Sequence, residues 1–193
     1  MKMKFKTLLI PVLFSASVFA SEQNATAPIT VKQEGIEYIK MLGGVLKTQL
    51  QTHMEADPSG MSALGFCTAK ATEITEEVNK KLPNYATVRR ASLKSRNEKN
   101  APDAIDIKVI QAYEKEIADK TFTPTDDIKI IQDGDTTRIY KPLITEAACL
   151  KCHGKDLSNE ITKSLSINYP KDQAINFTEG SLRGIIVSEI KKH

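Results

Sequence analysis

The residues with the clearest chemistry in this sequence are Cys149, Cys152 and His153, which form a single C-x-x-C-H motif. In an exported protein this spacing is typical of the attachment site of a c-type haem. The two thiols add across the vinyl groups of the porphyrin, and the adjacent histidine is placed to bind the iron. We therefore expect one covalently attached haem c, held through Cys149 and Cys152, with His153 as the proximal iron ligand.

Two other uses of paired cysteines agree less well with the sequence. A thioredoxin-like C-x-x-C belongs to a βαβ unit, where it begins a helix, whereas this motif follows a predicted strand that ends at Pro142. A structural zinc site needs four ligands, and here the fourth would have to come from a distant part of the chain. The sequence has only three cysteines and three histidines, so their convergence on this spacing favours haem.

Cys67 is the remaining cysteine, and it is the first candidate for the distal iron ligand. If Cys149 and Cys152 hold a haem, Cys67 cannot form an internal disulfide, and a free thiol in an oxidising compartment is a liability unless it is buried or ligated. Cys67 lies on the apolar stripe of a predicted helix, and His53, the alternative ligand, lies on another such stripe. Spacing alone leaves the choice open, and the remaining candidates are Met41, Met54, Met61 and His193.

Residues 1–20 have the organisation of a secretory signal peptide. Three lysines precede an apolar stretch that begins at Leu8, and Val18-Phe19-Ala20 predicts cleavage before Ser21. The alternative is an uncleaved anchor, but the apolar stretch is shorter than the roughly 18 residues of a spanning helix. We expect a periplasmic protein with no stable membrane insertion after cleavage. Asn24 lies in an N-x-T sequon within a flexible linker at 21–29, and an unmodified tail is the simpler interpretation.

The charge balance excludes a polyanionic partner. Removal of residues 1–20 takes three of the 27 basic residues and none of the 24 acidic ones, which leaves 24 of each. A neutral protein gives no reason to expect binding to nucleic acid. The length of 30–193 suits one domain with an ordinary core.

The periodicity predicts helices first and strands later. Helices are expected over 30–56, 61–82 and 103–119, and strands over 85–93, 128–131, 137–140 and 182–190. Asp133-Gly134 predicts a hairpin between the second and third strands. This order indicates an α+β fold, and its simplest form is an antiparallel sheet with helices packed on one side. The haem motif then falls in a loop after the hairpin.

The sequence resembles the family of single-haem c-type domains with a PAS-like fold that was long catalogued as a domain of unknown function. The matching residues span most of the chain: Cys67, Val88–Lys94 with Arg96-Asn97, Asn100–Asp103, Lys141–Leu143, Cys149–Gly154, Tyr169–Asp172 and Gly180–Gly184. The resemblance implies a PAS-like antiparallel sheet with N-terminal helices, and a haem bound between helices and sheet. It also implies His/Cys axial ligation, carried over here to His153 and Cys67.

A thiolate ligand stabilises ferric iron, so a His/Cys haem is expected to have a low reduction potential. We therefore expect redox or gas sensing, with a soluble periplasmic electron-transfer cytochrome as the alternative. The partner would be a redox protein or a small diatomic gas, and the fold analogy suggests a homodimer. We expect no enzymatic activity of the peroxidase type, because two protein ligands leave no position on the iron for a substrate.

The candidate partners of the haem propionates are Arg89 and Arg90, together with Lys94 and Arg96 of the same basic segment. A solvated strand edge is the alternative. Adjacent residues of a strand point to opposite faces, so at most one of Arg89 and Arg90 is expected to reach the haem.

Overall fold

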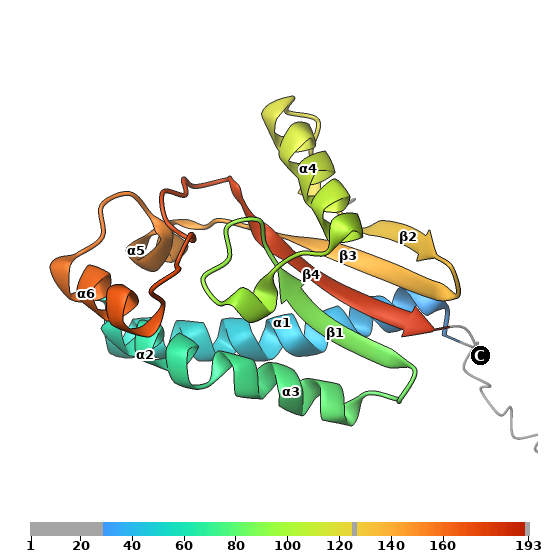
Figure 1. The fold of residues 1–193 in the computed structure, drawn as a ribbon, viewed down its shortest axis with the longest axis horizontal. Helices are drawn as coiled ribbons and strands as arrows, with labels where there is room; N and C mark the ends of the chain where they lie inside the picture. The colour runs from blue at the N-terminus through green and yellow to red at the C-terminus, as the bar shows by residue number, and fades with distance from the viewer. Residues whose placement is uncertain (1–28, 125–126, 192–193) are drawn as a thin grey trace, which may run out of the picture.

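The computed structural model describes residues 29–124 and 127–191, and these form a four-stranded antiparallel sheet with helices on both faces (Figure 1). The strand order is β1-β4-β3-β2. The strands are β1 (Ala86–Ala91), β2 (Lys129–Asp133), β3 (Thr136–Ile144) and β4 (Leu182–Lys191). The helices are α1 (Val31–Ala56), α2 (Met61–Ala69), α3 (Ala71–Lys81), α4 (Ala104–Ala118), α5 (Leu150–His153) and α6 (Asn159–Asn168), with short 3₁₀ turns at Glu98–Asn100 and Ala147–Cys149. The predicted signal peptide, Asn24 and His193 lie outside the described residues.

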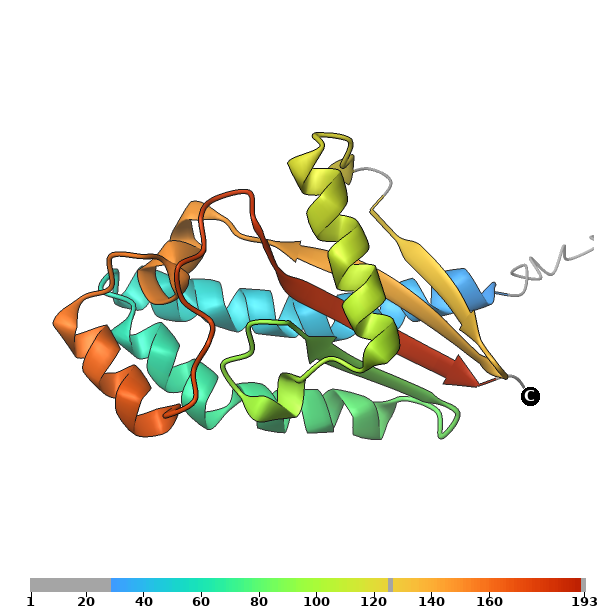
Figure 2. The ribbon, with the colours of Figure 1, turned by 45° about the horizontal axis from the view of Figure 1, so that its top comes forward.

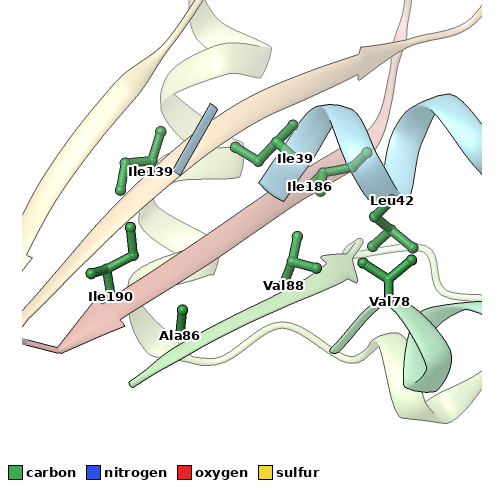
Figure 3. Close-up of a cluster of buried hydrophobic side chains, with 8 residues drawn as sticks. All are labelled: Ile39, Leu42, Val78, Ala86, Val88, Ile139, Ile186 and Ile190. Atoms are coloured by element: carbon green, nitrogen blue, oxygen red, sulfur yellow. The ribbon is translucent and has the colours of Figure 1, made fainter. Parts of the chain in front are cut away.

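α1 begins at Thr30, whose hydroxyl and the Gln33 side chain form a reciprocal capping box. Its buried face crosses the sheet, where Ile39 and Leu42 pack against strand residues such as Val88 and Ile186 (Figure 3). α1 comes so close to the sheet at Gly35 that a Cβ there would lie 2.6 Å from Ile139 Cδ1. None of the described helices is long and apolar enough to cross a membrane.

The expected helix over 61–82 is divided in two at Lys70, whose φ of −120° is not helical. The division lets each half take a different neighbour. α3 lies alongside β1. There the Asn79 side chain donates to Val88 O at 2.7 Å and accepts from Val88 N at 2.8 Å. Both halves pack on α1, and α2 packs in addition on α6. The apolar stripe runs through both halves, so periodicity alone did not reveal the break.

α4 corrects the expectation that all helices pack on one side of the sheet. It lies across the face opposite α1 and α3 (Figure 2). Val109, Ile110 and Tyr113 of α4 pack there against Tyr140 of β3 and against β4. This arrangement follows from β4, whose pattern of burial leaves both of its faces inside the protein. An apolar second face has to be covered, and α4 supplies the cover.

The C-x-x-C-H motif follows β3 directly, as expected, but it lies on the 3₁₀ turn Ala147–Cys149 and on α5 instead of in an open loop. α6 was not predicted, because its polar composition hides a short apolar stripe formed by Ile161 and Leu165. These two residues and Leu64 of α2 form a small core of their own. The motif therefore lies at the end of the sheet where α2, α5 and α6 meet (Figure 1).

Candidate functional site

His153 is held in the tautomer that a metal ligand needs. Its Nδ1 lies 2.7 Å from Ala174 O, and because a carbonyl oxygen only accepts, Nδ1 carries the proton. Nε2 is then left with a free lone pair, which is the atom a histidine presents to a metal. Burial, followed by the charges of Arg183 and Arg96, lowers the pKa of His153 well below its ordinary value. The imidazole is therefore neutral, as ligation requires.

Cys152 faces α2. Its Sγ lies 3.9 Å from Gly60 O, and the residue packs against the core formed by Leu64, Ile161 and Leu165. Burial raises the pKa of the Cys152 thiol, and the nearby charge of Cys67 raises it further. Tyr169 packs against the same core and donates to Cys67 O at 3.4 Å, so it connects the motif with the part of α2 that carries Cys67.

Arg96 and Arg183 affect the pKa of both Cys67 and His153. Burial raises the pKa of the Cys67 thiol, while Arg90, Arg96 and Arg183 lower it. Arg96 and Arg183 also lower the pKa of His153. The structure packs Cys152 of the motif beside Leu64 of α2, the helix that carries Cys67 more than 80 residues earlier in the chain.

Arg90 belongs to this group of cations and Arg89 does not. Arg89 points to the α4 side of the sheet, where it donates to Asp106 at 2.7 Å and to Glu189 at 2.7 Å. The candidate role of Arg89 as a propionate partner is therefore wrong, because its guanidinium is already bound by carboxylates on the face away from the motif. Arg90 lies on the same face as Val88, beside Cys67, as the alternation of a strand requires.

The charges at the site favour an anionic group such as haem. Arg90 is half-buried, and its buried Nε lacks a hydrogen-bond partner in the described part of the chain. Burial lowers the pKa of Arg90, and burial together with the repulsion of Arg96 lowers the pKa of Arg183 to about 10. Asp172 is the carboxylate ion-paired within the group, through Arg96. Propionates or an iron-bound thiolate would supply the missing negative charge.

The donor set also agrees with haem better than with a bare metal ion. Among residues 29–124 and 127–191, no three His, Cys, Asp or Glu side chains converge in a way that could hold an ion. Haem iron takes four of its ligands from the porphyrin, so Cys67 and His153 would complete its coordination.

His53, the alternative distal ligand, lies at the C-terminal end of α1. Its ring stacks on Phe66 with centroids 5.0 Å apart, and its Nδ1 lies 2.8 Å from the Ser62 hydroxyl. These contacts hold it between α1 and α2 as part of the helix packing. Met61 packs beside Leu64, and Met41 is exposed on α1.

Sequence reasoning did not assign a role to Arg183 or to the carbonyl of Ala174. Arg183 donates to Ser92 Oγ at 3.0 Å, and its guanidinium lies 5.2 Å from the Phe177 ring, which in turn packs edge-on against His153. The sequence signal that could have pointed to Arg183 is its charge, which stands near the start of the otherwise uncharged run Leu182–Ile186. Nothing in the sequence marks Ala174, because its contribution is a backbone atom placed by the fold.

The fold and the site together support a haem-binding protein of PAS-like α+β architecture. The chain belongs to the Tll0287-like family, whose model matches residues 15–190. The crystal structure of the cyanobacterial haem protein Tll0287 is similar to this one, with a TM-score of 0.54, 23% sequence identity, and coverage of 82% of this chain and 90% of that chain. At this identity the likeness shows the fold. The comparison with curated proteins gave no match. The expected family and fold class are therefore confirmed.

Proposed function

We propose that this protein is an exported single-haem c-type cytochrome with a low-potential haem ligated by His153 and Cys67, and that it acts in redox or gas sensing. The observation that carries the proposal is the packing of the C-x-x-C-H motif against α2, the helix that carries Cys67: Cys152 lies at the core that includes Leu64, and Tyr169 at the same core donates to Cys67 O at 3.4 Å. Haem would supply a one-electron redox centre at this position.

Covalent attachment follows from the positions of the two motif thiols. Cys149 directly precedes α5, and Cys152 lies within α5, about one helical turn later. His153 follows Cys152 directly. Each S–H would add across one vinyl C=C bond, which forms a thioether with no oxidant consumed. The periplasm is proposed as the location because residues 1–20 have the pattern of a signal peptide.

The Cys67 thiol determines the redox behaviour in this proposal. A thiolate ligand lowers the potential, whereas a protonated thiol is a weak donor that leaves iron easily. Burial raises the pKa of Cys67. Reduction of the iron would lower the positive charge of the site, and the thiol would then be released more easily in its neutral form. A released Cys67 would open a position for a diatomic gas. A soluble electron carrier is the alternative function, and it requires Cys67 to stay bound in both redox states.

The partner in the first case is a small gas and in the second a redox protein, with a homodimer proposed by analogy of fold. Enzymatic chemistry of the peroxidase type is not proposed, because Cys67 and His153 would both be held by the iron and would leave no position on it for a substrate.

The test is to replace Cys67 and His53 separately in protein made with haem-attachment machinery. Cys67→Ser is expected to change the ferric visible spectrum and to raise the midpoint reduction potential by at least about 59 mV. For one electron, this shift corresponds to a tenfold change in the ferric-to-ferrous equilibrium constant. His53→Gln should change neither. An unchanged ferric spectrum and potential in Cys67→Ser would refute the proposed ligand.

Carbon monoxide added to the reduced wild-type protein separates the two functions. A shift of the reduced Soret band shows that the distal ligand is labile and favours gas sensing. A band that CO leaves unmoved favours electron transfer or redox sensing with both ligands fixed.

A further inference from the structure

Arg96 lies behind the proximal histidine and makes three polar contacts there. Its Nη2 donates to Cys152 O at 2.6 Å and to Ala174 O at 3.1 Å, and its Nε donates to Asp172 at 3.0 Å. The Arg96 and Asp172 side chains are each 9% exposed. Ion pairs on the surface contribute little, but a buried pair of this kind acts strongly on its surroundings.

The contact with Ala174 O matters because this oxygen also accepts the Nδ1 proton of His153 at 2.7 Å. A carbonyl oxygen has two lone pairs, and here one faces His153 while the other faces a guanidinium. Asp172 holds the same residue through its other backbone group, since its Oδ1 accepts from Ala174 N at 2.8 Å. The acceptor of the histidine proton is thus fixed in place by an ion pair.

This arrangement affects how strongly His153 can donate electrons. A carbonyl that pulls on the Nδ1 proton makes the imidazole more basic and a stronger ligand. A cation on the same carbonyl draws electron density away from it and weakens that pull. The positive charge also disfavours the additional charge of ferric iron. Asp172 opposes both effects, because it neutralises Arg96.

We propose that Arg96 and Asp172 are positioning residues that set the reduction potential through the Ala174 carbonyl, with Arg96 raising the potential and Asp172 lowering it. The inference rests on the proposed function, because it requires His153 to be an iron ligand. It assigns this pair a role different from that of Arg90 and Arg183, whose guanidiniums make no contact of this kind with Ala174 O among the described residues.

The test measures midpoint potentials of the haem protein in two oppositely charged variants. Arg96→Gln is expected to lower the potential, and Asp172→Asn is expected to raise it, each by at least tenfold in the ferric-to-ferrous equilibrium, or about 59 mV. The Asn side chain retains an oxygen that can accept from Ala174 N, so Asp172→Asn removes charge while the peptide stays held. Damage to the fold alone would not move the two variants in opposite directions.

Two further variants complete the experiment. Lys171→Gln removes a charge from the same segment, but Lys171 pairs with Glu98 at an exposed position, so its potential should match the wild type. Arg96→Lys keeps the charge but cannot make all three contacts, and its potential should fall between those of wild type and Arg96→Gln. If Arg96→Gln fails to retain haem, Arg96→Lys and Asp172→Asn carry the test.

The outcomes separate this inference from the proposed function. Shifts of the same sign in Arg96→Gln and Asp172→Asn, or potentials equal to the wild type, would overturn the inference while the wild-type haem spectrum upholds the function. A wild-type protein without a haem c spectrum would overturn the proposed function itself.

Discussion

Arg89 and Arg90 are neighbours on one strand but have different surroundings: Arg89 pairs with a buried carboxylate, and Arg90 lies on the face of the sheet that holds the candidate site. Both are arginines on β1, yet Arg89 meets Asp106, a carboxylate that is 0% exposed, while Arg90 lies beside Cys67. The sequence could place the two on opposite faces by alternation. It could not say which face holds the site, because that depends on where α2 and α5 pack.

Replacing each arginine with glutamine should therefore have opposite consequences. Arg89→Gln leaves the buried Asp106 carboxylate without its closest cation and should lower the free energy of unfolding by about 3 kcal/mol, with the reduction potential unchanged. Arg90→Gln removes a cation from the proposed haem site and should lower the reduction potential of the haem protein, with a smaller change in stability. Urea unfolding and redox titration of both variants provide the check, and a potential that shifts only in Arg89→Gln would contradict the assignment.

At the scale of elements, the close crossing of α1 over the sheet depends on Gly35. A Cβ at this position would lie 2.6 Å from both Ile139 Cδ1 and Ser188 Oγ. The serine hydroxyl can rotate, but Ile139 is fully buried and has no space into which to move. α1 is long and carries His53 at its far end, so a displacement at Gly35 would reach the helix packing around α2.

Gly35→Ala should accordingly destabilise the protein by about 1–3 kcal/mol, the usual cost of overpacking a core. Gly44→Ala is the matched control on the same helix, because a Cβ there meets nothing within 4 Å. Alanine at an exposed helical position should stabilise by about 0.5–1 kcal/mol. The two free energies of unfolding should differ in sign, and a destabilised Gly44→Ala would show that the available space is not what decides.

Most elements could be predicted because their signals are local. The hairpin of β2 and β3 follows from Asp133-Gly134, and Gly134 has the positive φ of 59° that its turn requires. α4 starts at Asp103, which caps the helix through Ile105 N and Asp106 N. The break at Lys70 and the existence of α6 could not be predicted, because both depend on packing between α2 and α6 rather than on any local pattern.

The candidate site was predictable to a similar extent. The C-x-x-C-H motif is a local pattern, and Cys67 stood out as an unpaired thiol on an apolar stripe. The roles proposed for Arg96 and Asp172 could not be found in the same way, because they depend on contacts with the backbone of Cys152 and Ala174 that only the folded chain brings within reach.

On the scale of the whole molecule, the protein has two large cores on either side of the sheet and a small one at the motif. The large cores share β4, whereas the small core of Leu64, Ile161 and Leu165 joins α2 to α6 away from the sheet. Regions with few buried contacts open more easily than the rest of a fold. The end that carries Cys152 and His153 should therefore be able to loosen while the sheet remains intact.

Alanine substitutions in the two kinds of core should reveal this difference. Ile161→Ala should increase hydrogen exchange in residues 150–175 and leave the amides of β4 protected. Ile185→Ala, at an equally buried position in the central strand, should lower the global free energy of unfolding by about 2–4 kcal/mol and raise exchange throughout. Equal exchange profiles for the two variants would mean that the motif end and the sheet unfold as one unit.

The position of β4 also has a consequence for the timing of folding. β4 comes last of the four described strands in sequence, yet it lies between β1 and β3, which do not pair with each other. The sheet cannot close until residues 182–191 have been made, so its assembly depends on contacts between distant parts of the chain, which form slowly. Cys149 and Cys152 are synthesised before that closure. If haem is attached to them as proposed, the thiols remain accessible to the attachment machinery for as long as the central strand is still missing.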